Sequence, residues 1–334
     1  ESYPQVLVLE MGADKPGDIE YLLDIVKCDI GIVTKIGESH LEAFKTVENI
    51  KKEKGLIVKN LKKDGWAVLN FDDEQVFSLA KELKGNMLSY GLKQGADVWG
   101  MEIISSFEKT GRGEKLAGVG FKMKYKGSVV PVMLPETIGN PAIYAALAGA
   151  TVGVINGMNL VEISQSLREF RSPKGRMNMV DGIKGTMIID DTYNASPQSS
   201  LEALDAFNKI NIPKKSKKYA VFGDMLELGA YTEEGHALVG RSVATLDIDY
   251  LVTVGERARH IAEAAEEAGM EKDRIYHFSD RKDAGLFVQD RITTGDIILV
   301  KGSQGARMEK IVKEIMADPL RAEELLVRQG GEWR

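Results

Sequence analysis

Short apolar segments alternate with longer charged segments along most of this chain, and the alternation restricts the possible folds more than any other feature. Strands that alternate with helices favour a parallel sheet covered by helices. In residues 1–94 the pattern predicts four strands, at Gln5–Leu9, Ile30–Thr34, Trp66–Asn70 and Asn86–Tyr90. It also predicts three helices, at Gly17–Lys27, Thr46–Leu61 and Asp73–Lys84. The chain is therefore predicted to be of the α/β class.

The pattern changes between residues 97 and 135. Three segments alternate apolar and polar residues and are separated by glycine-containing turns, which indicates a small antiparallel sheet of about three strands. Two helices are predicted to follow, at Ala142–Ile155 and Leu160–Phe170.

Strand–helix alternation restarts after the segment Arg171-Ser172-Pro173-Lys174-Gly175, whose turn-forming and charged residues suit a linker. The second half is predicted to be Rossmann-like, with strands at Thr186–Asp190, Tyr219–Phe222, Tyr250–Val254, Ile275–Phe278 and Asp296–Val300, and helices at Pro197–Lys209, Glu233–Leu246, Arg257–Ala268, Arg281–Ile292 and Arg307–Ile315. We therefore expect one domain over residues 1–171 and a second over residues 172–334.

Composition excludes several classes of function. The 334 residues are 43% apolar and 28% charged, which is ordinary for a globular chain of two domains. The net charge of −6 gives no general attraction to nucleic acid or to a membrane surface. A single cysteine, Cys28, allows no internal disulfide and fits a reducing compartment. We expect a cytoplasmic, monomeric protein that is not inserted in a membrane.

Two polar groups follow predicted strands in the first half. Glu10 ends the first strand, and Glu38-Ser39-His40 follows the second. If these strands are parallel neighbours, Glu10 and His40 face the same crevice and could hold a divalent metal such as Mg²⁺. The alternative is a capped helix start with a solvated histidine.

Four motifs together resemble a known family: E-M-G-A-D-K-P-G-D-I at 10–19, T-K-I-G-E-S-H-L-E-A-F at 34–44, I-I-D-D-T-Y-N-A-S-P at 188–197 and F-G-D-M-L-E-L-G at 222–229. They resemble the Mur ligases, the ATP-dependent amide-forming enzymes of peptidoglycan synthesis, and within that family the members that add D-alanyl-D-alanine to a UDP-muramoyl peptide. The resemblance implies a central ATPase domain followed by the carboxyl-terminal domain. It also implies that ATP phosphorylates a carboxylate and that the amine of a dipeptide attacks the acyl phosphate.

The resemblance implies a Mg²⁺ site made by Glu10, His40 and Lys54, the last as a carbamate. A carbamate is an anion that can bind the metal, whereas an ammonium would repel it. Carbamylation requires the neutral amine and therefore a lowered lysine pKa. The residues alone favour the interpretation of Lys54 as a solvated helix lysine, with Lys51 and Lys52 nearby.

The resemblance also implies a nucleotide site. Asp191 would contact the ribose, Tyr193 and Asn194 would line the cleft, and Arg176 would reach the ATP phosphates. Asn140 is the one candidate for the family's adenine-contacting asparagines, because Ala142 and Ala145 stand where those are expected. Local pattern alone would leave Arg176 as a solvated linker residue.

Four further residues are expected at the substrate. Asp224 follows a predicted strand, and Lys301, Ser303 and Arg307 lie in K-G-S-Q-G-A-R-M-E-K, which also follows a strand and is predicted to open a helix. Backbone N–H groups at such a helix start favour anions, for example the carboxylate of an incoming dipeptide.

One expected element is absent from the sequence. No G-x-x-G-K-[ST] phosphate loop occurs, and in the family it lies upstream of the E-M-G strand. We therefore expect a chain that lacks the first strand and phosphate loop of its ATPase domain and that is inactive on its own. The alternatives are a non-catalytic or degenerate binding module and a sister ligase of the folylpolyglutamate or cyanophycin synthetase type.

Overall fold

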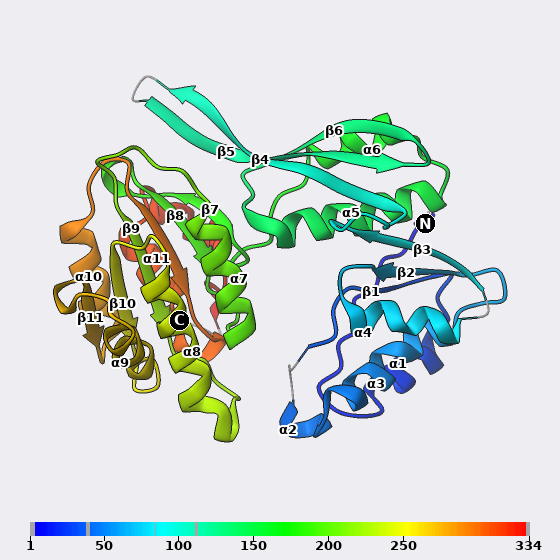
Figure 1. Cartoon of the computed structure of the whole chain (residues 1–334), viewed down its shortest axis with the longest axis horizontal. Coiled ribbons are helices and arrows are strands. Elements are labelled where there is room, and N and C mark those ends of the chain that lie inside the picture. Colours follow the sequence, from blue (N-terminus) through cyan, green and yellow to red (C-terminus); the bar gives the residue numbers. More distant parts are fainter. Residues whose placement is uncertain (1–3, 38–40, 84, 111–112, 332–334) are drawn as a thin grey trace. The chain divides into compact units, whose positions relative to one another are not determined.

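Two six-stranded sheets organise the chain in this computed structural model (Figure 1). The structure describes residues 4–37, 41–83, 85–110 and 113–331, without the side chains of 41, 42, 109, 110 and 113–115. Contacts divide the chain into two units. The first comprises Glu1–Ile103, Phe121–Val132 and Ile143–Leu167, and the second comprises Ile104–Gly120, Met133–Ala142 and Arg168–Arg334.

The first sheet joins parallel and antiparallel strands. Its order is β1-β2-β3-β4-β5-β6, with bounds Ile30–Val33, Trp66–Asn70, Asn86–Gly91, Val98–Thr110, Gly113–Tyr125 and Ser128–Pro135. Strands β1 to β4 pair in parallel. Only two residues connect β4 to β5 and β5 to β6, and connections so short require antiparallel neighbours. The predicted α/β class with a small antiparallel sheet is confirmed.

Six helices accompany this sheet: α1 (Asp18–Ile25), α2 (Leu41–Phe44), α3 (Val47–Lys59), α4 (Glu74–Phe77, continued by a 3-10 helix at Ser78–Glu82), α5 (Gly139–Ile155) and α6 (Leu160–Leu167). The hydroxyl of Thr46 caps α3 by accepting the N–H of Asn49. Apolar residues of α3 and α4 pack against β1 and β2 in one core cluster. Helix α2 was not predicted, since a four-residue helix is too short to show a period.

The predicted strand at Gln5–Leu9 is wrong. Residues 6–13 have no regular secondary structure, and the side chains from Val6 to Leu9 are between 47% and 85% exposed. Their apolar, strand-favouring composition is real, but a strand exists only when a neighbour satisfies its backbone N–H and C=O groups. Within the described residues this segment has no such partner strand.

The second sheet belongs to the second unit and has the order β11-β10-β9-β12-β8-β7. The strands, from β7 to β12, are Asn178–Asp181, Met187–Asp191, Lys218–Gly223, Tyr250–Val254, Ile275–Phe278 and Ile297–Lys301. All pairs are parallel except β7 with β8, which is antiparallel. The edge strand β7 was not predicted, because four residues with two polar members carry little strand signal.

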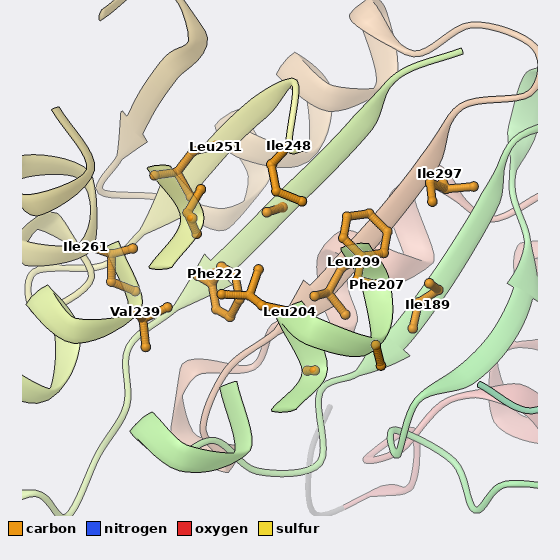
Figure 2. Close-up of a cluster of buried hydrophobic side chains, with 14 of the residues drawn as sticks. Ile189, Leu204, Phe207, Phe222, Val239, Ile248, Leu251, Ile261, Ile297 and Leu299 are labelled. Atoms are coloured by element: carbon orange, nitrogen blue, oxygen red, sulfur yellow. The ribbon is translucent and has the colours of Figure 1, made fainter. Parts of the chain in front are cut away.

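Helices cover both faces of the second sheet. Each strand alternates its side chains between the faces, so Ile189, Phe222 and Leu299 join one core cluster, whereas Ile188, Val221 and Val300 join the other. Figure 2 shows the first cluster, with Leu204 and Phe207 of α7 against the strands. Helices α7 (Pro197–Asn208), α8 (Thr232–Thr245) and α9 (Arg259–Glu267) lie on this face, and α10 (Arg281–Arg291), α11 (Glu309–Ile315) and α12 (Ala322–Leu325) lie on the other. Short 3-10 helices occupy Ile183–Gly185, Gly229–Tyr231, Lys272–Arg274, Gln304–Ala306 and Pro319–Arg321.

The strand order brings three loops together. Strand β12 lies between β8 and β9, so the segments that follow these strands meet at the carboxyl edge of the sheet. In open α/β sheets ligands bind at this edge. None of the helices in the described residues has the length and apolar character that crossing a membrane would require.

Candidate functional site at the carboxyl edges of the two sheets

An ion pair joins the ends of β8 and β12. Asp191 and Lys301 are directly opposite each other in the parallel register, so their side chains leave the same face of the sheet. The Nζ of Lys301 lies 2.6 Å from Oδ2 of Asp191 and also donates to the carbonyl oxygen of Asn194 at 3.0 Å. The Lys301 side chain is 2% exposed. The two predicted residues are therefore together, but Lys301 holds a carboxylate of its own chain.

The G-R-M segment lies beside the D-T-Y-N turn. The N–H of Met177 donates to Oδ1 of Asp191 at 3.1 Å, and the N–H of Tyr193 donates to the carbonyl of Gly175 at 2.9 Å. The guanidinium of Arg176 lies 4.2 Å from the centroid of the Tyr193 ring, a cation–π contact. Tyr193 is 44% exposed, so a face of this arrangement is open to solvent. Three of the predicted nucleotide residues, Arg176, Asp191 and Tyr193, are thus brought together.

The Asn194 side chain acts within its own turn, because its Oδ1 accepts the N–H of Ala195 at 2.9 Å. Helix α7 then begins with a capping box between Ser196 and Ser199 and with Pro197 at its first position. The D-D-T-Y-N-A-S-P motif therefore contains both a cluster at the strand end and the start signal of the helix.

Ser303 connects all three loops. Its Oγ donates to the carbonyl of Ala195 at 3.1 Å and accepts the N–H of Leu226 at 2.9 Å, while its N–H donates to the carbonyl of Asp224 at 3.0 Å. The carboxylate of Asp224 accepts the N–H of Ala258 at 2.8 Å. Both residues were predicted to bind substrate, and both have partners that fix the loops.

The predicted helix start at Arg307 is wrong. Helix α11 begins at Glu309, and the preceding residues form a 3-10 turn in which Arg307 has a left-handed φ of 53°. The N–H groups of Ser303, Ala306 and Arg307 all donate to carbonyls. The glycine-rich segment therefore forms a turn, and Ser303 within it contacts the neighbouring loops.

A buried carboxylate that the sequence did not single out lies behind this edge. Glu309 is 0% exposed, and its Oε1 lies 2.5 Å from Nε of Arg307. Its Oε2 accepts Nη1 of Arg328 at 3.0 Å. Arg307 was predicted to hold a substrate carboxylate, and in the structure its Nε holds that of Glu309.

The two adjacent acids at the end of β8 have different environments. Asp190 is fully buried, and its Oδ1 accepts the hydroxyl of Thr192 at 2.6 Å and the N–H of Thr192 at 3.2 Å. Its Oδ2 has no hydrogen-bond partner among the described residues. Burial, opposed by the Thr192 hydrogen bonds and reinforced by the charges of Asp191 and Glu309, raises the pKa of Asp190 to about 7.

His236 of α8 holds the loop after β9. The N–H of Met225 donates to Nε2 at 3.0 Å, so the proton is on Nδ1, which donates to the carbonyl of Thr232 at 2.6 Å. Burial lowers the pKa of this imidazole below its usual value. The histidine is therefore neutral and acts as a fixed support for the Asp224–Leu226 loop.

A pocket of about 620 Å³ opens next to Tyr193 within the second unit. Its wall combines the linker, the β8 and β12 loops and the segment after α12, and the lining residues are Lys174, Tyr193, Gln304, Glu323, Leu326, Val327, Arg328, Gln329 and Gly330. The lining includes two basic side chains, one acidic side chain and an exposed aromatic ring. The exposed ring of Tyr193 could stack on a planar group of a ligand.

Lys54 lies at the carboxyl edge of the first sheet. Its Nζ donates to the carbonyl of Lys35, in the segment after β1, at 3.1 Å. Burial lowers the pKa of the Lys54 ammonium, and the charge of Asp73 acts in the opposite direction. Asp73 accepts the N–H of Ile36 at 3.2 Å and caps α4 through the N–H of Val76 at 3.0 Å. The lysine therefore lies next to the segment that leads to His40.

The other two proposed metal ligands are not brought to Lys54 by the described residues. Glu10 is exposed in a stretch without regular structure, and His40 lies outside the described residues. In the part of the chain that the structure describes, no three His, Cys, Asp or Glu side chains are grouped as a metal site would need.

The Asp72 carboxylate connects the segment after β3 to helix α5. Its carboxylate accepts the N–H groups of Leu92, at 2.5 Å, and Lys93, at 3.0 Å, and the hydroxyl of Tyr144 at 2.7 Å. Together with the Asp73 cap, these contacts show that Asn70-Phe71-Asp72-Asp73 forms a turn followed by a helix cap. Asn140 is exposed in the first turn of α5.

Comparison with protein families identifies both halves of the chain. The Mur ligase middle domain matches residues 1–150, and a domain described as "Mur ligase, glutamate ligase domain" matches residues 175–304. The chain is 30% identical over 316 residues to the UDP-N-acetylmuramoyl-tripeptide–D-alanyl-D-alanine ligase of Bacillus subtilis (strain 168), covering 95% of this chain and 65% of that protein.

Solved structures agree. The MurF ligase from Thermotoga maritima in complex with ADP matches with a TM-score of 0.76 at 27% identity, over 91% of this chain and 65% of that one. A MurF crystal structure from Acinetobacter baumannii matches with a TM-score of 0.75 at 26% identity, over 92% and 64%. The chain therefore spans a little less than two thirds of the length of these relatives.

Proposed function

This chain belongs to the Mur ligase family, and on that premise we propose that it serves an ATP-dependent ligase that adds D-alanyl-D-alanine to a UDP-muramoyl peptide in peptidoglycan synthesis. The resemblance drawn from the motifs is confirmed at the level of the family. The reaction would proceed through an acyl phosphate, which the amine of the dipeptide attacks. The relative from B. subtilis carries this activity in its name.

One observation carries the proposal: Arg176, Asp191 and Tyr193 are adjacent at a carboxyl sheet edge, beside the 620 Å³ pocket. Asp191 would meet a ribose and Arg176 the phosphates of the nucleotide, with Tyr193 and Asn194 lining the site and Asn140 near the adenine. The MurF structure from T. maritima contains ADP, which supports the choice of ligand. Charge neutralisation and positioning are the main means by which proteins accelerate phosphoryl transfer.

Mg²⁺ is part of the proposal. When bound, the ion would neutralise charge on the transferred phosphoryl group. Glu10, His40 and a Lys54 carbamate are its proposed ligands, and the half-buried position of Lys54 supports this assignment because burial favours the neutral amine. The amine, not the ammonium, reacts with CO₂ to give the carbamate.

The substrate assignments are also proposals. Asp224, Lys301, Ser303 and Arg307 lie on the loops that meet at this edge, and we propose that they support the substrate site through their contacts within the fold. We further propose a domain boundary between residues 171 and 172, a monomer and a cytoplasmic location, which the single cysteine favours.

The test uses the complete protein encoded by the gene. It is incubated with ATP, Mg²⁺, UDP-muramoyl-tripeptide and D-alanyl-D-alanine, and product is followed by mass and by phosphate release. Arg176→Ala should lower kcat/KM by about 10²-fold or more, as loss of a charged contact to phosphate does. Arg171→Ala is the matched control, because Arg171 is an exposed arginine of the same segment that pairs with Glu136. No ligation by the parent protein would refute the function, and equal rates for both variants would remove Arg176 from the phosphates.

A further inference from the structure

Arg328 connects the carboxyl-terminal segment to the proposed nucleotide turn. It follows α12, belongs to none of the motifs and is 5% exposed. Its Nη1 donates to the carbonyl of Thr192 at 3.0 Å and to Oε2 of Glu309 at 3.0 Å, and its Nη2 donates to the carbonyl of Tyr193. One side chain therefore binds two consecutive carbonyls of the turn and a fully buried carboxylate.

The backbone around this contact adopts an uncommon conformation. Arg307 and Arg328, the two arginines that hold Glu309, have φ angles of 53° and 55°, and Met177, which donates to Asp191, has a φ of 51°. Left-handed φ angles are unfavourable for residues other than glycine and persist where the surroundings determine them. Such residues concentrate at ligand sites. Met177 and Arg328 contact the turn directly, and Arg307 shares Glu309 with Arg328.

We propose that Arg328 is a positioning residue of the nucleotide site, an inference that rests on the function proposed above. By holding the carbonyls of Thr192 and Tyr193, it sets the direction in which the Asp191 carboxylate and the Tyr193 ring leave the turn. Its guanidinium lies 5.9 Å from the Tyr193 ring centroid, and that of Arg176 lies 4.2 Å from it. Two guanidiniums therefore lie near the Tyr193 ring, and one of them comes from the segment after α12.

Arginine suits this position better than lysine. The planar guanidinium carries five N–H donors in a rigid fork, and here it serves three acceptors: two carbonyls and a carboxylate oxygen. A lysine ammonium could retain the charge next to Glu309 without keeping the geometry at both carbonyls. Arg328→Lys should therefore restore part of what Arg328→Ala loses.

The first measurement needs no ligand. Amide hydrogen exchange reports on the turn, because the N–H groups of Thr192, Tyr193 and Ala195 are bonded to Asp190, Gly175 and Asn194. We expect exchange in the peptide that contains residues 191–195 to be at least about 10-fold faster in Arg328→Ala, with β9 as an internal reference that does not change. Arg321→Ala is the matched control, because Arg321 is an exposed arginine of the same segment that pairs with Glu324.

The second measurement separates positioning from folding. In the complete protein, Arg328→Ala should raise the KM for ATP about 10-fold or more relative to Arg321→Ala, and Arg328→Lys should recover part of that loss. If Arg328→Ala does not fold, Arg328→Lys and Arg328→Gln carry the same comparison. Exchange and KM values equal to those of Arg321→Ala would overturn the proposal. A parent protein that shows no nucleotide-dependent activity would instead refute the proposed function, while local exchange would still decide whether Arg328 holds the turn.

Discussion

Charged residues at the carboxyl edge of the second sheet form ion pairs with one another. Lys301 and Asp191 form a pair that is almost fully buried, and Glu309 is held by two arginines. A buried charge is tolerated only when it is paired and hydrogen-bonded. Residues predicted to contact substrate therefore fix the loops that carry the exposed groups, such as the Tyr193 ring.

At the residue scale, Lys54 provides a direct test of the carbamate. The pKa of its ammonium is lowered by burial, so the neutral amine becomes available at a lower pH than for an ordinary lysine. We expect a protein-bound carbamate signal in carbon-13 NMR after addition of labelled bicarbonate, growing as pH rises through the lowered pKa.

Lys54→Ala should abolish that signal, and Lys59→Ala, on the same helix, should leave it unchanged, since Lys59 pairs with Glu82 at 2.6 Å. A signal that persists in Lys54→Ala would assign the carbamate to another amine. Ligase activity in the complete protein should fall with the signal, and short carboxylates should restore part of it.

At the element scale, helices α8 and α9 approach so closely that only glycine fits between them. A Cβ added at Gly240 of α8 would lie 2.2 Å from the carbonyl oxygen of Ile261 in α9. The two helices carry Val239, Val243, Ile261 and Ala265 into the core beneath the Asp224 loop. Their separation therefore affects both stability and the loop.

Gly240→Ala should lower the free energy of unfolding by about 1–3 kcal/mol, because the helices must move apart. Gly149→Ala in α5 is the matched control: nothing lies within 4 Å of the added methyl group, so it should stabilise the helix by about 0.5–1 kcal/mol. Urea unfolding of the three proteins gives both values. Equal unfolding midpoints for Gly240→Ala and the parent would contradict this prediction, because they would show that α9 moves without loss of stability.

At the scale of the whole molecule, Asp190 links stability to pH. Its pKa rises from 3.8 to about 7 in the folded protein. Below the lower value both states are protonated, and between the two values the unfolded chain has lost a proton that the native state keeps. Stability must therefore fall as pH rises through this range and stay reduced above it.

Asp190→Asn removes this dependence. Relative to the parent, the variant should gain stability between about pH 4 and about pH 7, by at most about 4 kcal/mol for a shift of this size. Asp205→Asn is the control, because it removes the same charge at an exposed position on α7. Unfolding by urea at several pH values is the measurement, and parallel curves for Asp190→Asn and the parent would contradict the burial argument.

Much of the element pattern could be predicted locally. Trp66–Asn70 is a strand with the expected bounds, and Pro197 begins its helix where predicted, because apolar period, caps and proline act on neighbouring residues. The motifs were also sufficient to identify the family. Short elements such as α2 and β7 were missed. Two predictions were wrong, the strand expected at Gln5–Leu9 and the helix start expected at Arg307, and both segments depend on contacts with distant residues.

The amino-acid sequence by itself determined the α/β class, most helices and strands, and the family. Only the tertiary structure decided their partners. Asp191 meets Lys301 because β12 enters the sheet between β8 and β9, and Arg328 reaches Thr192 across 136 positions of the chain. Local patterns follow from steric and hydrogen-bonding preferences over a few residues. Strand order and buried ion pairs follow instead from the free energy of the whole folded unit, which no local window contains.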